Sequence, residues 1–104
     1  MKKATIDFPE EYLKMSKERK ESLINWIENN FYSRKTVNNQ HTSYGLKHIL
    51  GRDTGTYFTN DEFKGGMIEM GYTPHDTREL NWRFNISERS INDTTKRINN
   101  KNKY

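Results

Sequence analysis

The chain has 104 residues, with 18 Lys and Arg against 14 Asp and Glu, no cysteine, and 31% hydrophobic residues. This length fits one small domain, and the absence of cysteine excludes disulfides, thiolate metal sites and cysteine nucleophiles. No apolar stretch approaches the roughly 20 residues that span a bilayer, and the first residues lack the apolar run of a secretory signal, so we expect a cytoplasmic protein.

Residues 9–32 have a helical pattern. Pro9 suits a first-turn position, and the acidic residues that follow it complement the helix dipole. Ser16 offers a second start, as the cap of a separate segment. Four apolar residues then recur at helical spacing and predict one buried stripe: Leu23, Ile24, Ile27 and Phe31. Trp26 lies well off this stripe, so it covers the edge of the core or faces a partner.

A second helix is predicted over 43–50, after a loop without periodicity. Its buried face consists of three apolar residues: Leu46, Ile49 and Leu50. Tyr44 and His48 lie four residues apart on the opposite face, with Lys47 beside them, so we expect these side chains to be exposed. Residues 51–55 carry two glycines around an aspartate and therefore predict a turn.

Thr59 and Glu62 give the strongest local signal, the capping box of a helix that starts beside them. Gly71 fits the left-handed position that ends such a helix. Gly65 and Gly66 lie inside it, where each glycine costs about 1 kcal/mol relative to alanine. We therefore expect another segment or a ligand to pass close to these glycines, and packing is the favoured explanation.

Residues 81–86 alternate polar and apolar side chains, the pattern of a half-buried strand. Three of them face the core: Trp82, Phe84 and Ile86. We expect this strand to pair with an extended segment at 57–58, across the helix between them. The predicted fold class is therefore α+β, a small single domain of three or four helices with a short two-stranded sheet, similar in outline to a winged helix.

The positive charge is concentrated near the end of the chain. Residues 88–104 carry five basic and two acidic side chains, and Ile91 and Ile98 could anchor a weak helix there. We assign residues 1–87 to one compact domain and residues 88–104 to a basic tail, mobile or weakly helical. A basic tail can bind phosphates by releasing counterions, although the favoured interpretation is a solubilising end.

Catalytic and metal-binding constellations are not found in the sequence. The three histidines have no further ligand at the spacing that zinc sites use. Ser43 and His48 would point about 140° apart on a helix, so they do not form a nucleophile–base pair. No glycine-rich loop with a following lysine forms a phosphate cradle. We therefore expect a protein without enzymatic activity, cofactor or metal ion.

Aromatic and basic side chains instead predict a binding surface around the second helix. Six residues are the candidates: Tyr44, Lys47, His48 and Arg52, extended by Lys64 and Arg83 if the elements that carry them pack side by side. Such side chains suit phosphate contacts combined with stacking on a base or ribose. They also suit a protein interface, where tyrosine and arginine are common anchors. The plain alternative is an ordinary solvated face.

Four short motifs occur in order along the middle of the chain: SYGLKH over 43–48, GTYFTNDEFKGGM over 55–67, GYTP over 71–74 and NWRF over 81–84. With this series, residues 40–87 resemble a group of small accessory proteins carried by phages, plasmids and integrative or conjugative elements of Gram-positive bacteria. The resemblance implies an accessory-genome setting, in which small proteins often regulate genes of the element or block host defence nucleases.

The main functional hypothesis is a non-enzymatic binding module of a mobile genetic element that binds nucleic acid, or a nucleic-acid–protein complex, in a regulatory role. The alternative is a protein-directed inhibitor of a bacterial defence nuclease, an anti-CRISPR or anti-restriction protein. Neither requires a membrane, and a homodimer is compatible with both. Residues 36–87 carry a net charge of −1, and the helix at 60–70 starts with acidic side chains, which weighs against pressing that helix on DNA.

Overall fold

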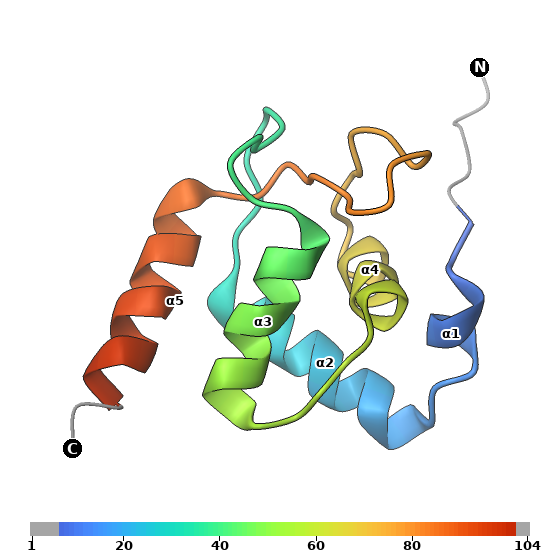
Figure 1. Cartoon of the computed structure of the whole chain (residues 1–104), viewed down its shortest axis with the longest axis horizontal. Coiled ribbons are helices and arrows are strands. Elements are labelled where there is room, and N and C mark those ends of the chain that lie inside the picture. Colours follow the sequence, from blue (N-terminus) through green and yellow to red (C-terminus); the bar gives the residue numbers. More distant parts are fainter. Residues whose placement is uncertain (1–6, 102–104) are drawn as a thin grey trace.

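The computed structural model describes residues 7–101, which form five helices with α4 at the centre (Figure 1). In chain order these are α1 (Glu10–Leu13), α2 (Lys17–Asn30), α3 (Ser43–Thr54), α4 (Asn60–Glu69) and α5 (Glu88–Lys101). In the view of Figure 1, α4 is seen nearly end-on, with α1 on its right, α3 on its left and α2 crossing below. Helix α4 contacts α1, α2 and α3, whereas α5 packs against α2 and α3.

The first helical region is two helices rather than one. Ser16 lies between α1 and α2, and its side chain accepts a hydrogen bond from the Arg19 backbone N–H at 3.2 Å. The start predicted at Ser16 is therefore confirmed. Trp26 is buried at the edge of the core, where its ring meets the Phe31 ring edge-on at a centroid distance of 5.0 Å.

Helix α4 begins and ends as the sequence predicts. The Thr59 hydroxyl accepts from the Glu62 N–H at 3.1 Å, and the Glu62 carboxylate accepts from the Thr59 N–H at 2.9 Å. These two bonds complete the capping box. Gly71 has a φ of 91°, the left-handed conformation expected after the last turn of the helix.

The two glycines inside α4 let its neighbours approach closely. A Cβ on Gly65 would collide with the Tyr12 ring of α1, and a Cβ on Gly66 would lie 2.6 Å from Leu23 Cδ2 of α2. Both of these side chains are buried. Packing between helices therefore accounts for both glycines, and the packing interpretation is confirmed.

The segment 82–86 is extended, and its apolar side chains are buried as the alternation predicts: Trp82, Phe84 and Ile86. Its backbone carbonyls, however, accept hydrogen bonds of 2.7–2.8 Å from four N–H groups on other parts of the chain: those of Arg34, Asn38, Ser43 and His75. Three of these donors are spread along the stretch that leads from α2 to the first residue of α3, and His75 lies in the loop after α4. The bonds form only isolated bridges and no continuous ladder among the described residues.

The predicted α+β class with a two-stranded sheet is therefore wrong, since residues 7–101 contain helices and only isolated bridges. Alternation specifies which face of a segment is buried, but not which backbone it pairs with. Tyr57, in the expected partner segment, instead has its carbonyl bound by the Arg19 guanidinium at 3.3 Å. Pro74 forms an isolated antiparallel bridge with Phe84 of the extended segment, but proline has no N–H that could extend the bridge into a ladder. Because residues 7–101 contain no such sheet, the predicted similarity to a winged helix is also wrong.

Helix α3 continues through Thr54, past most of the turn predicted over 51–55. The reversal is confined to Gly55, whose φ is 74°. Asp53 therefore lies in the last helical turn, where its carboxylate accepts from the Trp26 indole N–H at 2.8 Å. This contact helps to stabilise a helical turn that the local glycines disfavour.

Residues 88–101 form α5, with Ile91 and Ile98 buried on its inner face. The Thr94 hydroxyl donates to the Asn30 carbonyl at the end of α2 at 2.9 Å. This part of the predicted tail is therefore packed on the body of the molecule, while residues 102–104 lie outside the described residues. Within residues 7–101, no helix has the length and apolar character needed to cross a bilayer.

Candidate functional site

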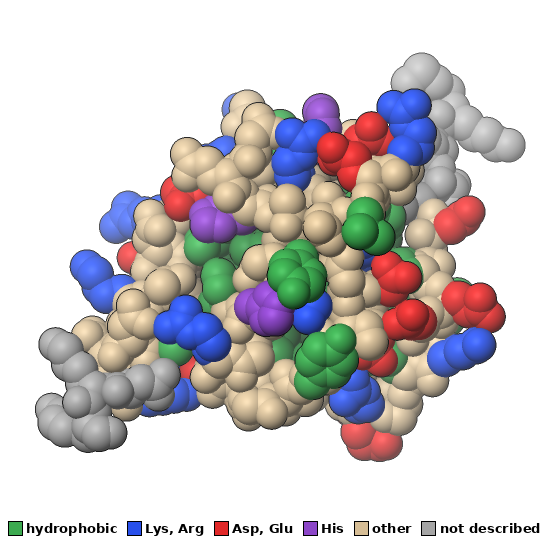
Figure 2. Space-filling view, in the orientation of Figure 1, with side chains coloured by type: hydrophobic (Ala, Val, Ile, Leu, Met, Phe, Trp, Pro, Cys, Tyr) green, Lys and Arg blue, Asp and Glu red, His purple; other side chains and the backbone are tan. Residues whose placement is uncertain are grey.

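The exposed face of α3 carries an aromatic pair. Tyr44 is 53% exposed and His48, one turn later, is also exposed, with the ring centroids 4.5 Å apart in an edge-on contact. Leu46 and Leu50, on the opposite face, are buried. The predicted exposure of Tyr44 and His48 is therefore confirmed. Figure 2 shows hydrophobic, histidine and basic side chains gathered near the middle of the face that α3 presents.

Lys47, from the same helix, is only 7% exposed. Its Nζ atom lies between two tyrosines, 5.1 Å from the Tyr44 ring centroid and 4.7 Å from the Tyr57 ring centroid. Both distances are those of cation–π contacts. The prediction that Lys47 is exposed is wrong because Tyr57, from the segment after α3, covers it.

Tyr57 is held in place by the segment that follows α3. Phe58 is only 4% exposed and anchors this segment in the core, so its neighbour Tyr57 points outward and is 69% exposed. The Arg19 guanidinium of α2 lies 4.6 Å from the Phe58 ring centroid and also donates to the Tyr57 carbonyl at 3.3 Å. The backbone that carries the Tyr57 ring is therefore fixed by the core and by α2.

A shallow pocket of about 150 Å³ opens beside Lys47. The end of α3 and the segment after it line the pocket: Lys47, His48, Gly51, Gly55, Thr56, Tyr57 and Phe58. Pockets for small-molecule ligands usually range from about 300 to 1,000 Å³, so this one suits a single side chain or a small anion. We call the four residues Tyr44, Lys47, His48 and Tyr57, together with this pocket, the Lys47 surface.

Two of the other candidate residues are engaged with neighbouring side chains. Arg52 is exposed, and its Nη2 donates to Asn99 Oδ1 of α5 at 2.7 Å. Lys64 is 5% exposed, with its Nζ 4.5 Å from the Trp82 ring centroid and 3.3 Å from the Asp61 carboxylate. The charge of Lys64 is therefore used inside the molecule.

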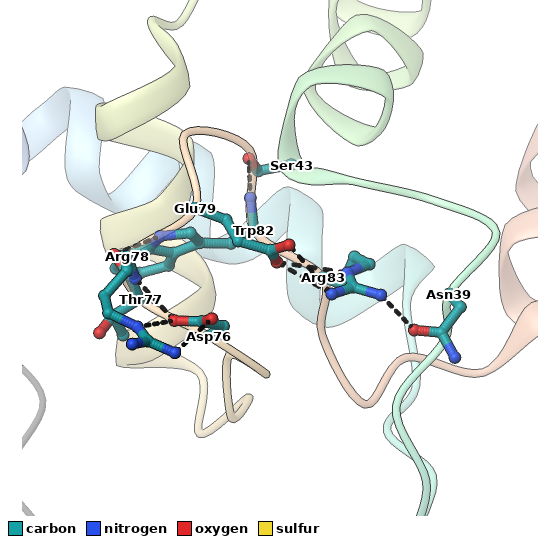
Figure 3. Close-up of polar contacts among 8 residues, drawn as sticks. All are labelled: Asn39, Ser43, Asp76, Thr77, Arg78, Glu79, Trp82 and Arg83. Carbon is teal, nitrogen blue, oxygen red and sulfur yellow. Dashed lines mark hydrogen bonds and ion pairs between the residues drawn. The ribbon is translucent and has the colours of Figure 1, made fainter.

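Arg83 belongs to a network of polar contacts between loops (Figure 3). Its guanidinium pairs with the Glu79 carboxylate at 3.0 Å and donates to the Asn39 side-chain oxygen at 2.7 Å. Figure 3 shows the guanidinium between these two groups. The structure therefore does not bring Lys64 and Arg83 to the Lys47 surface as available cations.

Asp53 is the shared carboxylate of an ion-pair cluster that was not predicted from the sequence. Its carboxylate is 9% exposed and forms ion pairs with Arg97 at 2.8 Å and Lys101 at 2.6 Å, both from α5. The hydrogen bond from Arg97 is the main cause that holds the pKa of Asp53 well below its usual range. Because these residues lie far apart in the sequence, no local pattern connects them. The cluster fastens α5 to α3, so we interpret it as structural.

Two side chains of a type that often acts in catalysis, Ser43 and His41, are engaged in contacts with neighbouring groups. Ser43 donates to Asn60 Oδ1 at 2.7 Å and accepts from the Trp82 N–H at 3.0 Å, so it joins α3 to α4 and to the extended segment. His41 pairs with Glu88 at 3.0 Å. Within residues 7–101, no three His, Asp or Glu side chains are placed to hold a metal ion.

No family model, no curated protein and no solved structure matches this chain. The functional interpretation therefore depends on the chemistry of the Lys47 surface. Two exposed tyrosines, an exposed histidine and a recessed ammonium can make apolar contacts, donate hydrogen bonds and attract an anion. This combination is typical of a binding surface.

Proposed function

We propose that this protein is a non-enzymatic binding module and that the Lys47 surface is its contact with a protein partner. The observation that carries the proposal is the pair of large rings, Tyr44 and Tyr57, which are 53% and 69% exposed on either side of a recessed ammonium. Tyrosine buries a large area and keeps a hydrogen-bonding group, so it is a frequent anchor at protein interfaces.

A further exposed apolar side chain lies in the loop that follows α4. Leu80 is 79% exposed, and its backbone carbonyl accepts from the Asn60 side-chain amide at 3.2 Å. Asn60 in turn accepts from the hydroxyl of Ser43, the residue before Tyr44, at 2.7 Å. The Leu80 backbone is therefore linked through Asn60 to the start of α3. Exposed apolar side chains mark interaction sites where they gather, as Tyr44 and Tyr57 do around Lys47.

The charges on this face weigh against nucleic acid as the partner of the Lys47 surface. Binding to a duplex requires several cations that can replace counterions at the phosphates. Lys47 is enclosed by rings, while Lys64 and Arg83 are paired with carboxylates. Arg52 is the one exposed cation among the basic candidates, so the face suits a protein better.

Nucleic acid remains the second candidate, at a different face. Arg89 and Lys96 of α5 are exposed, and none of the ion pairs among residues 7–101 involves either side chain. Figure 2 shows basic side chains along the edge formed by α5. Two such cations support weak phosphate contacts, so we rank this candidate after the protein partner.

The resemblance of residues 40–87 to accessory proteins of mobile genetic elements suggests the class of partner. In that setting small proteins often regulate genes of the element or block host defence nucleases, and a surface that suits a protein partner favours the second role. We therefore propose a bacterial defence nuclease, either a CRISPR effector or a restriction enzyme, as the target, with the protein acting as its inhibitor in the bacterial cytoplasm.

The test compares two tyrosine changes in one assay. Tyr44→Ser with Tyr57→Ser removes both rings of the Lys47 surface, whereas Tyr32→Ser removes a ring that is 65% exposed elsewhere. Each full-length protein is titrated by calorimetry against the nuclease that the unmodified chain captures from a host lysate. We expect roughly tenfold or weaker binding by the double variant and unchanged binding by Tyr32→Ser.

Equal binding by all three proteins would overturn the proposal. The second candidate is separated by titrating a DNA duplex at about 0.05 M and 0.2 M salt, because phosphate contacts weaken steeply with salt. Strong duplex binding that is lost in Arg89→Ala with Lys96→Ala, combined with unchanged binding by the tyrosine double variant, would make nucleic acid the partner.

A further inference from the structure

Two buried lysines of this protein have similar aromatic cover but different electrostatic partners. Lys64 is 5% exposed and lies against the Trp82 ring, with the Asp61 carboxylate 3.3 Å from its ammonium. Lys47 is 7% exposed and lies between two tyrosine rings, yet none of the ion pairs among residues 7–101 involves its ammonium. Buried charges are normally paired, because removal from water is costly. Lys64 therefore has a paired carboxylate, whereas Lys47 has none among the described residues.

The position of the Lys47 ammonium leaves room for that anion. Among the described residues, every fully buried side-chain nitrogen or oxygen has a hydrogen-bond partner. Within residues 7–101 Lys47 Nζ has no hydrogen-bond partner, so it keeps contact with solvent. Lys47 is one of the residues that line the pocket of about 150 Å³, which provides the opening. An anion in this opening would meet an ammonium flanked by apolar rings, where the attraction between charges is stronger than in bulk water.

We propose that this pocket receives a carboxylate side chain, Asp or Glu, of the protein partner. The inference deepens the proposed function and rests on it. One ammonium balances the single charge of one carboxylate, and the volume of the pocket suits one side chain. The exposed rings of Tyr44 and Tyr57 exclude water around the ion pair once the partner covers them, which is the arrangement of an interface hot spot.

A phosphate group matches this pocket less well. Phosphate monoesters carry nearly two charges and bind best to guanidinium forks, to backbone N–H groups or to helix N-termini. Of the lysines and arginines in the part of the chain that the structure describes, only Lys47 lines the pocket, and Arg52 is bonded to Asn99 instead. The pocket also lies at the C-terminal end of α3, where the helix dipole disfavours a doubly charged anion more than a singly charged one.

The test uses three small probes, the N-acetyl N-methylamides of glutamate, glutamine and phosphoserine. Each is titrated at millimolar concentrations into the full-length chain, while NMR follows the Lys47 side chain and the Tyr44 and Tyr57 rings. Glutamate and glutamine have the same shape and differ in charge. We expect saturable shifts of these signals with the glutamate probe, weaker shifts with the phosphoserine probe, and none with the glutamine probe.

Two lysine variants give a matched comparison. Lys47→Met keeps an unbranched side chain that is one atom shorter and removes its charge, so the glutamate probe should no longer shift the two rings. Lys20→Met is the control, because Lys20 Nζ also lies over a tyrosine, 5.1 Å from the Tyr12 ring centroid, but does not line the pocket. We expect Lys20→Met to respond like the unmodified chain. Circular dichroism establishes that each variant is folded.

Stronger shifts with phosphoserine than with glutamate would overturn the inference and point to a phosphate ligand. Equal responses to glutamate and glutamine, or no response to any probe, would also overturn it, and these measurements need no variant. The two proposals fail separately. If the Tyr44 and Tyr57 double variant loses the partner while Lys47→Met binds it with unchanged affinity, the protein interface stands and the carboxylate pocket does not.

Discussion

Helices α1 and α5 lie at opposite ends of the molecule (Figure 1), and they are attached in different ways. Helix α1 packs on α4 through the Tyr12 ring, which occupies the space that Gly65 leaves open. Helix α5 packs on α2 and α3 through buried isoleucines and adds ion pairs from Arg97 and Lys101 to Asp53. One contact depends on shape, and the other depends on shape and charge.

The difference separates two ways of docking a helix. Close packing against a glycine cannot accommodate a larger side chain, because protein interiors are dense and one added methyl group must displace a neighbouring side chain. An ion-pair cluster depends on the charge state of its members, so it responds to pH and to the loss of one carboxylate. We therefore expect the α1 contact to fail by steric overlap and the α5 contact to fail by loss of charge.

Gly65→Ala should have the largest effect on stability. The new Cβ would overlap the Tyr12 Cβ and Cγ, which are close to the backbone and cannot move without shifting α1. Overpacking of this kind costs about 1–3 kcal/mol, and we expect a loss near the upper end because Tyr12 is only 2% exposed. Urea denaturation followed by circular dichroism measures the loss in the free energy of unfolding.

Gly45→Ala is the matched control for this change. It makes the same substitution inside α3, where an added Cβ meets no atom within 4 Å other than those of its chain neighbours and of its own helix backbone. The higher helix propensity of alanine should raise the free energy of unfolding by about 0.5–1 kcal/mol. If the two alanine variants lost stability equally, close packing at Gly65 would not determine how α1 is attached.

Asp53→Asn should have the next largest effect. The change keeps the shape of the side chain and removes the charge that Arg97 and Lys101 share. These two partners are 46% and 50% exposed, so solvent screening limits the loss to about 1–2 kcal/mol. Hydrogen exchange should accelerate in α5 and stay unchanged in α4. Asp93→Asn is the control, an exposed carboxylate of α5 in no ion pair among the described residues, and it should leave exchange in α5 unchanged.

The elements that were predicted correctly are those with a complete local signal. The capping box at 59–62 and the cap at Ser16 each need only a few neighbouring residues, and both are present in the structure. The alternation over 82–86 likewise identified the buried face. The sheet was predicted wrongly because the hydrogen-bond partners of an extended segment, such as Ser43 and Asn38 here, lie far along the chain.

The Lys47 surface could be predicted in part. Helical spacing places Tyr44 and His48 on one exposed face, and the structure has them there. Taking Phe58 as the buried residue of its segment would also have placed Tyr57 outside. No local pattern predicts that the Tyr57 ring lies over Lys47. That contact depends on how the chain turns after α3. The burial of Lys47 follows from this tertiary contact.

The α5 contact should also weaken in acid. The pKa of Asp53 lies well below its usual range, chiefly because Arg97 donates a hydrogen bond to it. A carboxyl whose pKa is lower in the folded state stabilises that state above its unfolded pKa of about 3.9, and this contribution is lost as the pH falls through the folded pKa. The stability difference between the unmodified chain and Asp53→Asn should therefore be constant above about pH 5 and shrink below about pH 4. A difference that persists unchanged in stronger acid would contradict the charge-based attachment of α5.

Tyr12→Phe should have the smallest effect, and it separates the ring from the hydroxyl at the α1 contact. The hydroxyl donates to Glu69 at 3.2 Å, a hydrogen bond that contributes about 0.5–1 kcal/mol. Burial, assisted by the Glu69 carboxylate, raises the pKa of Tyr12 to about 12, so this contribution is present below the unfolded pKa of about 10 and is lost as the pH rises through the folded value. Urea denaturation at neutral pH measures the loss. A loss as large as that of Gly65→Ala would make the α1 contact polar, like that of α5, whereas a small loss with the ring retained assigns the contact to packing.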